Sequence, residues 1–180
     1  MENVNFKLKS KDLVLLANEP IMCEKMKAHI EGLKHYAFSV IIRNDLGMIL
    51  LQKRALTKYH SGGIWSNACC GHPLDISSYQ SLNNSAKVRL QEELNINTKL
   101  RFLFQFEYSA KCSSLVENEI DYVFEGKSNQ ETFHYNPQEV CDMRWIKVKD
   151  LVQEINQTSD IFTPWFLILM KKYIYNYFFT

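Results

Sequence analysis

The chain has 180 residues, of which 46% are hydrophobic and 23% charged, and this balance is typical of a globular domain with a sizeable core. Its formal net charge of +1 excludes a general attraction to nucleic acid or to an anionic membrane surface. Any site for an anion must therefore be local.

Five cysteines, an odd number that includes the adjacent Cys69 and Cys70, make a poor disulfide framework. The opening residues lack the charged and then apolar pattern of a signal peptide. We therefore expect reduced thiols, a cytoplasmic location and a monomer. The longest apolar run, residues 163–180, is interrupted by Lys171 and Lys172. It predicts a core helix rather than stable membrane insertion, with a helix lying on a membrane surface as the alternative.

The first half of the chain predicts two short elements followed by a hairpin. We expect a loose tail at residues 1–10, a strand at 13–17, and a helix from Pro20 to about His29. Residues 36–42 are rich in β-branched and aromatic side chains, which favours a strand. The sequence NDLG at residues 44–47 predicts a tight turn, and residues 48–52 return as the second strand.

The second half predicts alternating helices and strands. Residues 77–84 form a surface loop or the entry to a helix over 86–94, which Asn95 can close in a left-handed conformation. Strands are expected at 100–108, 115–124 and 143–148, with a loop at 109–114 and a turn at Asn136-Pro137. A helix at 150–155 and one over 163–178, opened by Thr163-Pro164, follow. This mixture predicts one α/β or α+β layered domain over residues 1–180.

Residues 65–73 (WSNACCGHP) bring a thiol and an imidazole close together. In an extended segment, Cys70 and His72 point to one side, whereas Cys69 points to the other and packs. Gly71 allows close approach, and Pro73 ends the strand. A suitably placed thiol can transfer a proton or attack a substrate. Taken alone, the segment is most simply a buried strand end, because free cysteine is commonly buried as a small hydrophobe.

Glu117 and Glu119 lie two residues apart on an expected strand, so both face one side, and apolar neighbours argue against open surface. Buried paired carboxylates need a cation. His29, His35 and His72 supply imidazoles, and such a set of nitrogen and oxygen ligands suits Zn²⁺ or Mn²⁺. The alternative is that these histidines are hydrogen-bonded core residues.

Four basic residues lie on separate expected elements. Individually each would be a solvated surface charge, but together they would hold a diphosphate, since arginine chelates phosphate oxygens and lysine supplies a point charge. They are Lys25, Arg54, Lys58 and Arg89.

Residues 89–94 (RLQEEL) are similar to a degenerate Nudix helix. The matching residues are Arg89, Glu92 and Glu93, with Gly71 as the possible leading glycine. However, Leu90 stands where the Nudix box has a glutamate, Asn95 where it has a glycine, and the leading segment is too long. A Nudix hydrolase gathers its catalytic Mg²⁺ with those carboxylates. The departures therefore argue against hydrolysis and leave the fold in place.

Together these motifs resemble the type 1 isopentenyl-diphosphate Δ-isomerases. The matching segments, in family order, are residues 35–39 (HYAFS), 54–58 (RALTK), 65–73, 92–94 (EEL), 116–119 (VENE) and 163–165 (TPW). The resemblance implies a Nudix-like α/β (α+β) sandwich, in which a central mixed sheet is flanked by helices.

The resemblance also implies the reaction, which interconverts isopentenyl and dimethylallyl diphosphate by protonation and deprotonation in isoprenoid precursor biosynthesis. The substrate would be a small prenyl diphosphate, with no nucleic-acid partner. The alternatives are a Nudix hydrolase of a nucleotide or prenyl diphosphate, and a binding module without catalysis.

The same resemblance implies a role for each candidate residue. One divalent metal, Mn²⁺ or Zn²⁺, would be held by His29, His35, His72, Glu117 and Glu119. A Mg²⁺ that arrives with the diphosphate would be held by Glu93 and the Cys70 carbonyl. The diphosphate clamp would be Lys25, Arg54, Lys58 and Arg89. Cys70 and Glu119 would be the opposed acid and base, Tyr108 would hydrogen-bond the catalytic glutamate, and Trp165 would line the pocket.

Overall fold

The computed structural model describes residues 12–19 and 21–178, so the expected tail at 1–10 and Pro20 lie outside the described residues. A small antiparallel sheet pairs β1 (Leu13–Leu15) with β2 (Met22–Glu24). The main sheet has the order β5-β4-β3-β8-β7, with β6 also paired to β3 and β9 to β4. Its strands are β3 (His35–Arg43), β4 (Met48–Arg54), β5 (Trp65–Asn67), β6 (Cys69–Gly71), β7 (Arg101–Cys112), β8 (Leu115–Lys127) and β9 (Val140–Lys147).

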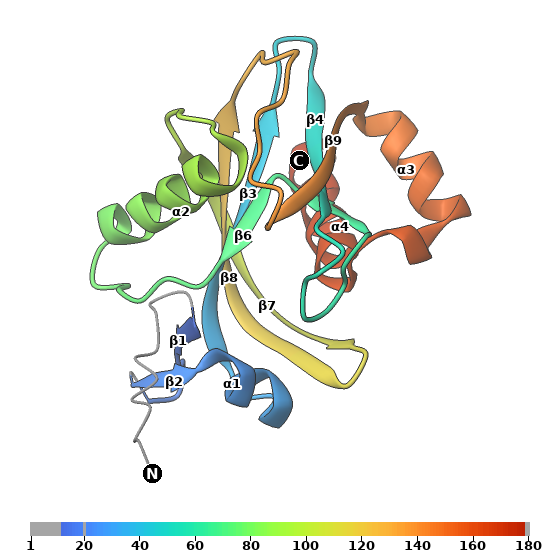
Figure 1. Ribbon diagram of the computed structural model, residues 1–180. Coiled ribbons are helices and arrows are strands. Elements are labelled where there is room, and N and C mark those ends of the chain that lie inside the picture. The colour runs from blue at the N-terminus through green and yellow to red at the C-terminus, as the bar shows by residue number, and fades with distance from the viewer. Residues whose placement is uncertain (1–11, 20, 179–180) are drawn as a thin grey trace.

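Helices flank both faces of this sheet (Figure 1). They are α1 (Lys25–Glu31), α2 (Tyr79–Leu94), α3 (Val148–Gln157) and α4 (Pro164–Phe178), with the short 3-10 helix η2 (Ser159–Ile161) before α4. The pair β3 and β8 is parallel, whereas the other main-sheet pairs are antiparallel. The predicted mixed sheet flanked by helices is therefore confirmed.

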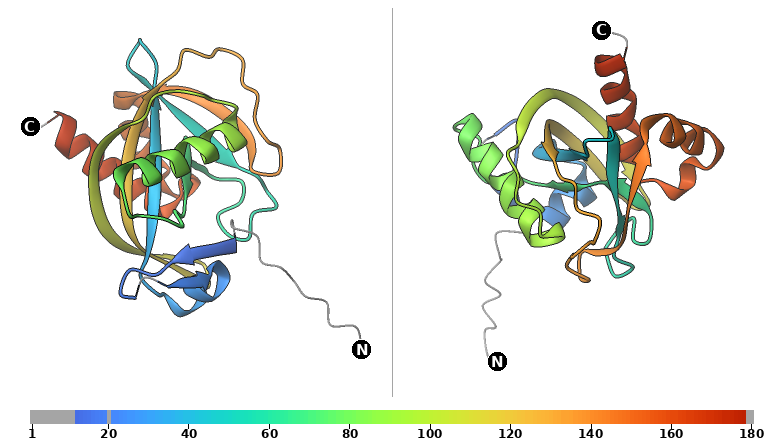
Figure 2. Two further views of the ribbon diagram at one scale, coloured as in Figure 1. Left: turned by 90° about the vertical axis from the view of Figure 1, so that its left-hand side faces the viewer. Right: turned by 90° about the horizontal axis from the view of Figure 1, so that it is seen from above.

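Alternation along the central strands separates two hydrophobic cores, because successive side chains on a strand point to opposite faces. Phe38 and Val40 of β3 pack in one core with Leu90 of α2. Ile41 of the same strand packs in the other core with Phe166 of α4. Figure 2 shows α2 and α4 on opposite sides of the sheet. None of the helices in the described part of the chain is both long and apolar enough to cross a bilayer.

The expected helix from Pro20 was wrong at its start. Residues 22–24 instead form β2, in which Met22 pairs with Leu15 and Glu24 with Leu13, and the helix α1 begins at Lys25. Pairing with the neighbouring strand β1 therefore overrides the local helix signal.

Three other boundaries also differ from expectation. The helix α2 begins at Tyr79, where the side chain of Ser78 accepts a hydrogen bond from the backbone of Ser81 as an N-cap. The expected loop at 109–114 was wrong, because β7 continues to Cys112. Residues 65–71 form two short strands that separate at Ala68.

Candidate active site

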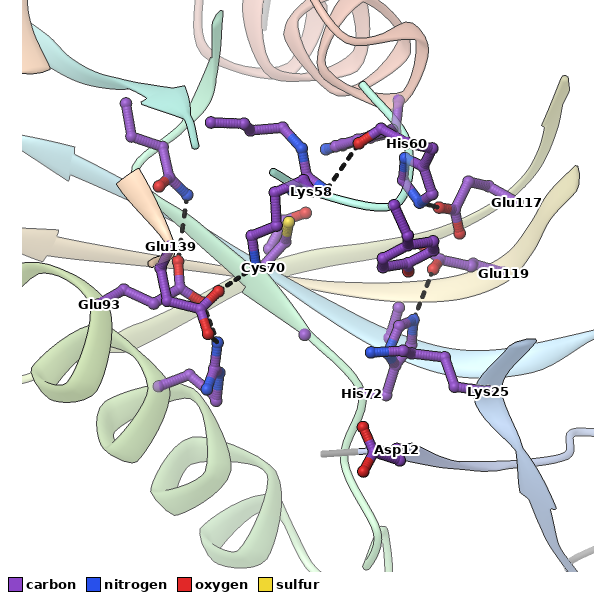
Figure 3. A pocket seen from close by; sticks show the side chains of 18 of the residues that line it. Asp12, Lys25, Lys58, His60, Cys70, His72, Glu93, Glu117, Glu119 and Glu139 are labelled. Carbon is purple, nitrogen blue, oxygen red and sulfur yellow. Dashed lines mark hydrogen bonds and ion pairs between the residues drawn. The ribbon is translucent and has the colours of Figure 1, made fainter. Parts of the chain in front are cut away.

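A cavity of about 400 Å³ lies against the central strands and brings together residues that are far apart in the sequence (Figure 3). Its lining includes Lys25 from α1, Cys70 from β6, Arg89 from α2 and Trp165 from α4. The predicted residues Arg54, Lys58, His72, Glu93, Tyr108, Glu117 and Glu119 also line it. The structure thus gathers these candidates in one place.

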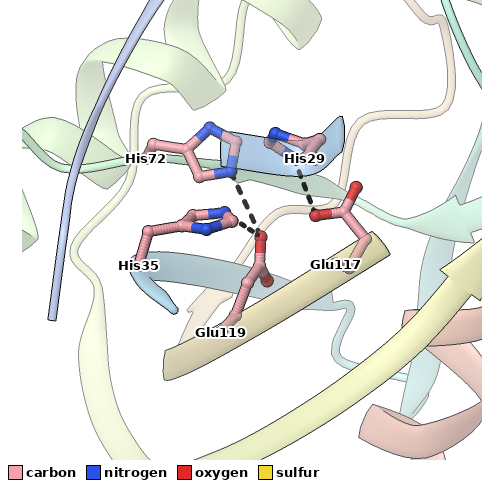
Figure 4. A group of neighbouring side chains, drawn as sticks. All are labelled: His29, His35, His72, Glu117 and Glu119. Carbon is pink, nitrogen blue, oxygen red and sulfur yellow. Dashed lines mark hydrogen bonds and ion pairs between the residues drawn. The ribbon is translucent and has the colours of Figure 1, made fainter. Parts of the chain in front are cut away.

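The five candidate ligands His29, His35, His72, Glu117 and Glu119 form one group, in which one ligand atom of each lies within 4.8 Å of the others (Figure 4). All except His72 are buried. The register of the sheet explains part of this arrangement, because His35 pairs directly with Glu119 in the parallel ladder of β3 and β8. His29 comes from α1, which packs against β8 and ends at Gly32 in a left-handed conformation (φ 63°).

Two histidines of this group present a free ring nitrogen to the carboxylates. The Nδ1 atom of His29 lies 2.6 Å from the Lys25 carbonyl, and that of His35 lies 2.8 Å from the Leu33 carbonyl. Because a carbonyl only accepts, each Nδ1 carries the proton and each Nε2 keeps a lone pair. A carbonyl contact of this kind is the usual partner of a metal-binding histidine.

Several atoms of the group are close together without forming hydrogen bonds. His29 Nε2 lies 2.9 Å from Glu117 Oε2, yet neither atom, nor His35 Nε2, meets a hydrogen-bond partner in suitable geometry among the described residues. Buried polar atoms of this kind need a partner. Buried ligand atoms that lie this close together and lack partners suit a divalent cation, so the group fits such an ion.

Charge also favours a cation here. Burial raises the pKa of the Glu117 carboxyl, but when His29 and His60 present protons to this carboxylate they outweigh burial and hold that pKa well below its usual range. Glu117 is therefore a carboxylate at neutral pH.

The adjacent cysteines face opposite sides of β6, as predicted. Cys69 is fully buried in the core beneath α2. Cys70, which pairs with Ser39 of β3, lines the cavity. Burial raises the pKa of the Cys70 thiol to about 12, although nearby Arg54 opposes the increase. Cys70 is therefore a protonated thiol at neutral pH.

Glu119 is held by hydrogen bonds at both oxygens. The Tyr108 hydroxyl donates to Oε2 at 2.5 Å, and the two residues are direct partners across β7 and β8. His72 Nε2 lies 3.1 Å from Oε1. The predicted contact between Tyr108 and the glutamate is therefore present.

The four predicted cations converge on the cavity, and acidic residues accompany them. Arg89 contacts Glu93 at 2.5 Å and Glu139 at 3.5 Å, and Lys58 is also bonded to Glu139. In Figure 3, Glu93 and Glu139 lie on one side of Cys70, and Glu117 and Glu119 lie on the other. The cavity thus has a region of paired basic and acidic residues beside the thiol and a histidine-carboxylate region beyond it.

Sequence reasoning missed several residues of this cavity, two of which have charged or metal-binding side chains close to predicted site residues. Glu139 follows the turn at Asn136-Pro137, and His60 lies in the loop after β4. His60 Nε2 is 2.9 Å from Glu117 Oε1, and its ring stands edge-on to Trp165 with the centroids 5.5 Å apart. Spacing along the chain could not identify Glu139 or His60 as site residues, because their contacts in the cavity are with residues far away in the sequence.

A NUDIX domain model matches residues 33–166. The isopentenyl-diphosphate Delta-isomerase of Burkholderia multivorans is 39% identical over 162 residues, which are 89% of this chain and 90% of the relative. Isopentenyl-diphosphate Delta-isomerase 2 of Photorhabdus laumondii is 40% identical over 143 residues, 79% of this chain and 78% of the relative.

A solved MutT protein of Methanosarcina mazei shares the fold, with a TM-score of 0.61 at 16% identity over 77% of this chain and 91% of that one. This likeness concerns the fold alone. The two isomerases match the sequence over most of both chains. This chain therefore belongs to the isopentenyl-diphosphate Delta-isomerase family, built on a NUDIX domain.

Proposed function

We propose that this protein interconverts isopentenyl and dimethylallyl diphosphate by adding a proton to one carbon and removing a proton from another. The observation that carries the proposal is the placement of Cys70 and Glu119. These two proton-carrying groups come from different strands and line one cavity, so they can flank a substrate bound between them.

The diphosphate is held in the region of paired basic and acidic residues. Arg54 and Arg89 supply planar guanidinium groups that suit phosphate oxygens, and Lys25 and Lys58 supply point charges. Glu93 and the Cys70 carbonyl would hold a Mg²⁺ that arrives with the diphosphate. On binding, the substrate replaces the carboxylate partners of Arg89 and Lys58 as the neutralising anion.

The proton steps need two groups and a dry pocket. Protonation of the alkene gives a tertiary carbocation, which water would capture. The aromatic face of Trp165, buried with 5% exposure, stabilises such a cation and excludes water. One of Cys70 and Glu119 gives a proton to the alkene, and the other removes a proton from the resulting cation. The Tyr108 hydroxyl holds the Glu119 carboxylate in position.

The histidine-carboxylate group would hold Mn²⁺ or Zn²⁺, which suit mixed nitrogen and oxygen ligands. When bound, such an ion would supply positive charge beside Glu119 and so bias this carboxyl toward its ionised form. We also propose a reducing, cytoplasmic location, which the five unpaired cysteines support, and a monomeric state.

Hydrolysis is less well supported than isomerisation. The position after Arg89, where a Nudix hydrolase has a glutamate, is Leu90, and this side chain is fully buried in the core beneath α2. It can supply neither a ligand nor a base to the cavity.

One assay separates the three functions that the sequence left open. Purified protein is incubated with isopentenyl diphosphate and Mg²⁺, and both an acid-labile allylic product and free phosphate are measured. We expect allylic product with no phosphate release, and loss of that product in Glu119→Gln. Phosphate release would instead support a hydrolase, and no turnover by the unaltered protein would support a binding module.

A further inference from the structure

A second cluster of potential metal ligands adjoins the first. One ligand atom each of His60, Cys112 and Glu117 lies within 4.8 Å of the others. The three residues are 7%, 4% and 5% exposed, respectively. We propose that they form a second metal position, which shares Glu117 with the five-residue group.

The two oxygens of Glu117 face different histidines. Oε2 lies 2.9 Å from His29 Nε2, whereas Oε1 lies 2.9 Å from His60 Nε2. A carboxylate that presents one oxygen to each of two neighbouring positions can bridge two ions, and bridged ions in two-metal sites stand roughly 3.5–4 Å apart. Figure 3 shows His60 on the side of Glu117 that faces away from His72.

His60 is oriented as a ligand rather than as an ordinary hydrogen-bonded histidine. Its Nδ1 lies 3.3 Å from the Ser61 hydroxyl, which can accept that proton and leave a lone pair on Nε2. Although Nε2 is near Glu117, it forms no aligned hydrogen bond with any described residue. A simple histidine-carboxylate hydrogen bond would align the two groups.

Members of the cluster line two different cavities. Cys112 lines a second cavity, about 540 Å³ in volume, together with Ser61 and Phe162. His60 and Glu117 line the substrate cavity.

The ligand types define the class of ion. One imidazole, one thiolate and one carboxylate suit Zn²⁺ and similar borderline ions such as Co²⁺, whereas Mg²⁺ and Ca²⁺ prefer oxygen ligands alone. Three protein ligands leave an open coordination position for water.

Cobalt titration of the metal-free protein tests the proposal, with bound ions counted by mass spectrometry and thiolate-to-cobalt absorption followed in the near ultraviolet. We expect two ions per chain, one of which gives the thiolate band. Cys112→Ser should lose that band and one ion, and His60→Asn should weaken the same ion by at least roughly 10–100-fold. Thermal melting of the metal-free variants checks that they are folded.

Two further variants separate this position from its neighbours. Cys70→Ser should keep the band, which excludes the cavity thiol as its source. His35→Ala should lose the ion of the five-residue group, which gives no thiolate band, and should keep the ion that gives the band. Loss of metal from the five-residue group can therefore be distinguished from loss of metal from the second position. A band that persists in Cys112→Ser, or a single ion with no band in the unaltered protein, would overturn the proposal.

Discussion

Replacing Cys69 or Cys70 by alanine removes the same sulfur atom from adjacent positions of β6, and opposite results are expected. Cys69 is fully buried in the core beneath α2, so its loss should cost about 1 kcal/mol in burial and cavity terms. For a chain of this size, that lowers the melting temperature by roughly 2–4 °C. Isomerisation should be retained, since Cys69 is not among the residues that line the cavity.

Cys70→Ala should show the converse behaviour. It removes a proton-carrying group from the cavity wall, and such groups contribute roughly 10²–10⁴-fold to rates. The loss of stability should be no more than about 1 kcal/mol, because this thiol is only partly buried and lines a cavity. Initial rates of allylic product formation and thermal unfolding by circular dichroism, measured on the same preparations, test both expectations. Equal loss of activity in the two variants would refute the assignment of faces.

Three other perturbations probe the surrounding contacts. Tyr108→Phe removes the hydrogen bond to Glu119, which is worth about 1.5–3 kcal/mol to a charged acceptor. Steady-state kinetics should show kcat/KM reduced by roughly 10–100-fold, and an unchanged value would contradict the role of Tyr108. Ser39→Ala removes the hydroxyl that donates to the buried Asp121 carboxyl at 2.8 Å. Urea unfolding should show a loss of about 1–3 kcal/mol, whereas unaltered stability would mean that another donor takes over. A chelator should lower the melting temperature, because an ion bound only by the folded chain stabilises it, by about 2.7 kcal/mol at 100 times its Kd. Adding Mn²⁺ or Zn²⁺ should restore it, and insensitivity to the chelator would count against the metal group.

The parts of the site that the sequence predicted depend on strand alternation. Cys69 and Cys70 face opposite sides, and Glu117 and Glu119 share one side, because a period of two is a local property of an extended chain. The turn at residues 44–47 and the left-handed Asn95 (φ 52°) are local in the same sense. Such features can be recognised without any knowledge of tertiary contacts.

The parts that could not be predicted depend on strand pairing and side-chain contacts that local propensity and spacing do not reveal. Residues 22–24 carry a helix signal but pair with β1, and residues 109–112 look like a loop but extend β7 against β8. His60 acquires its significance only from its distance to Glu117. The convergence of the four cations was expected only from the resemblance to a known family, because spacing along the chain cannot establish it.

The parallel pairing of β3 with β8 also has a kinetic consequence. His35 and Glu119 are direct partners in this ladder, which joins segments from opposite halves of the chain, and non-local parallel pairing forms slowly. The ion-binding group is therefore completed by the same event that closes the sheet. An ion bound only by the completed group should slow unfolding, because it stabilises the native chain and not the unfolded one. Such an ion would extend the lifetime of the native chain.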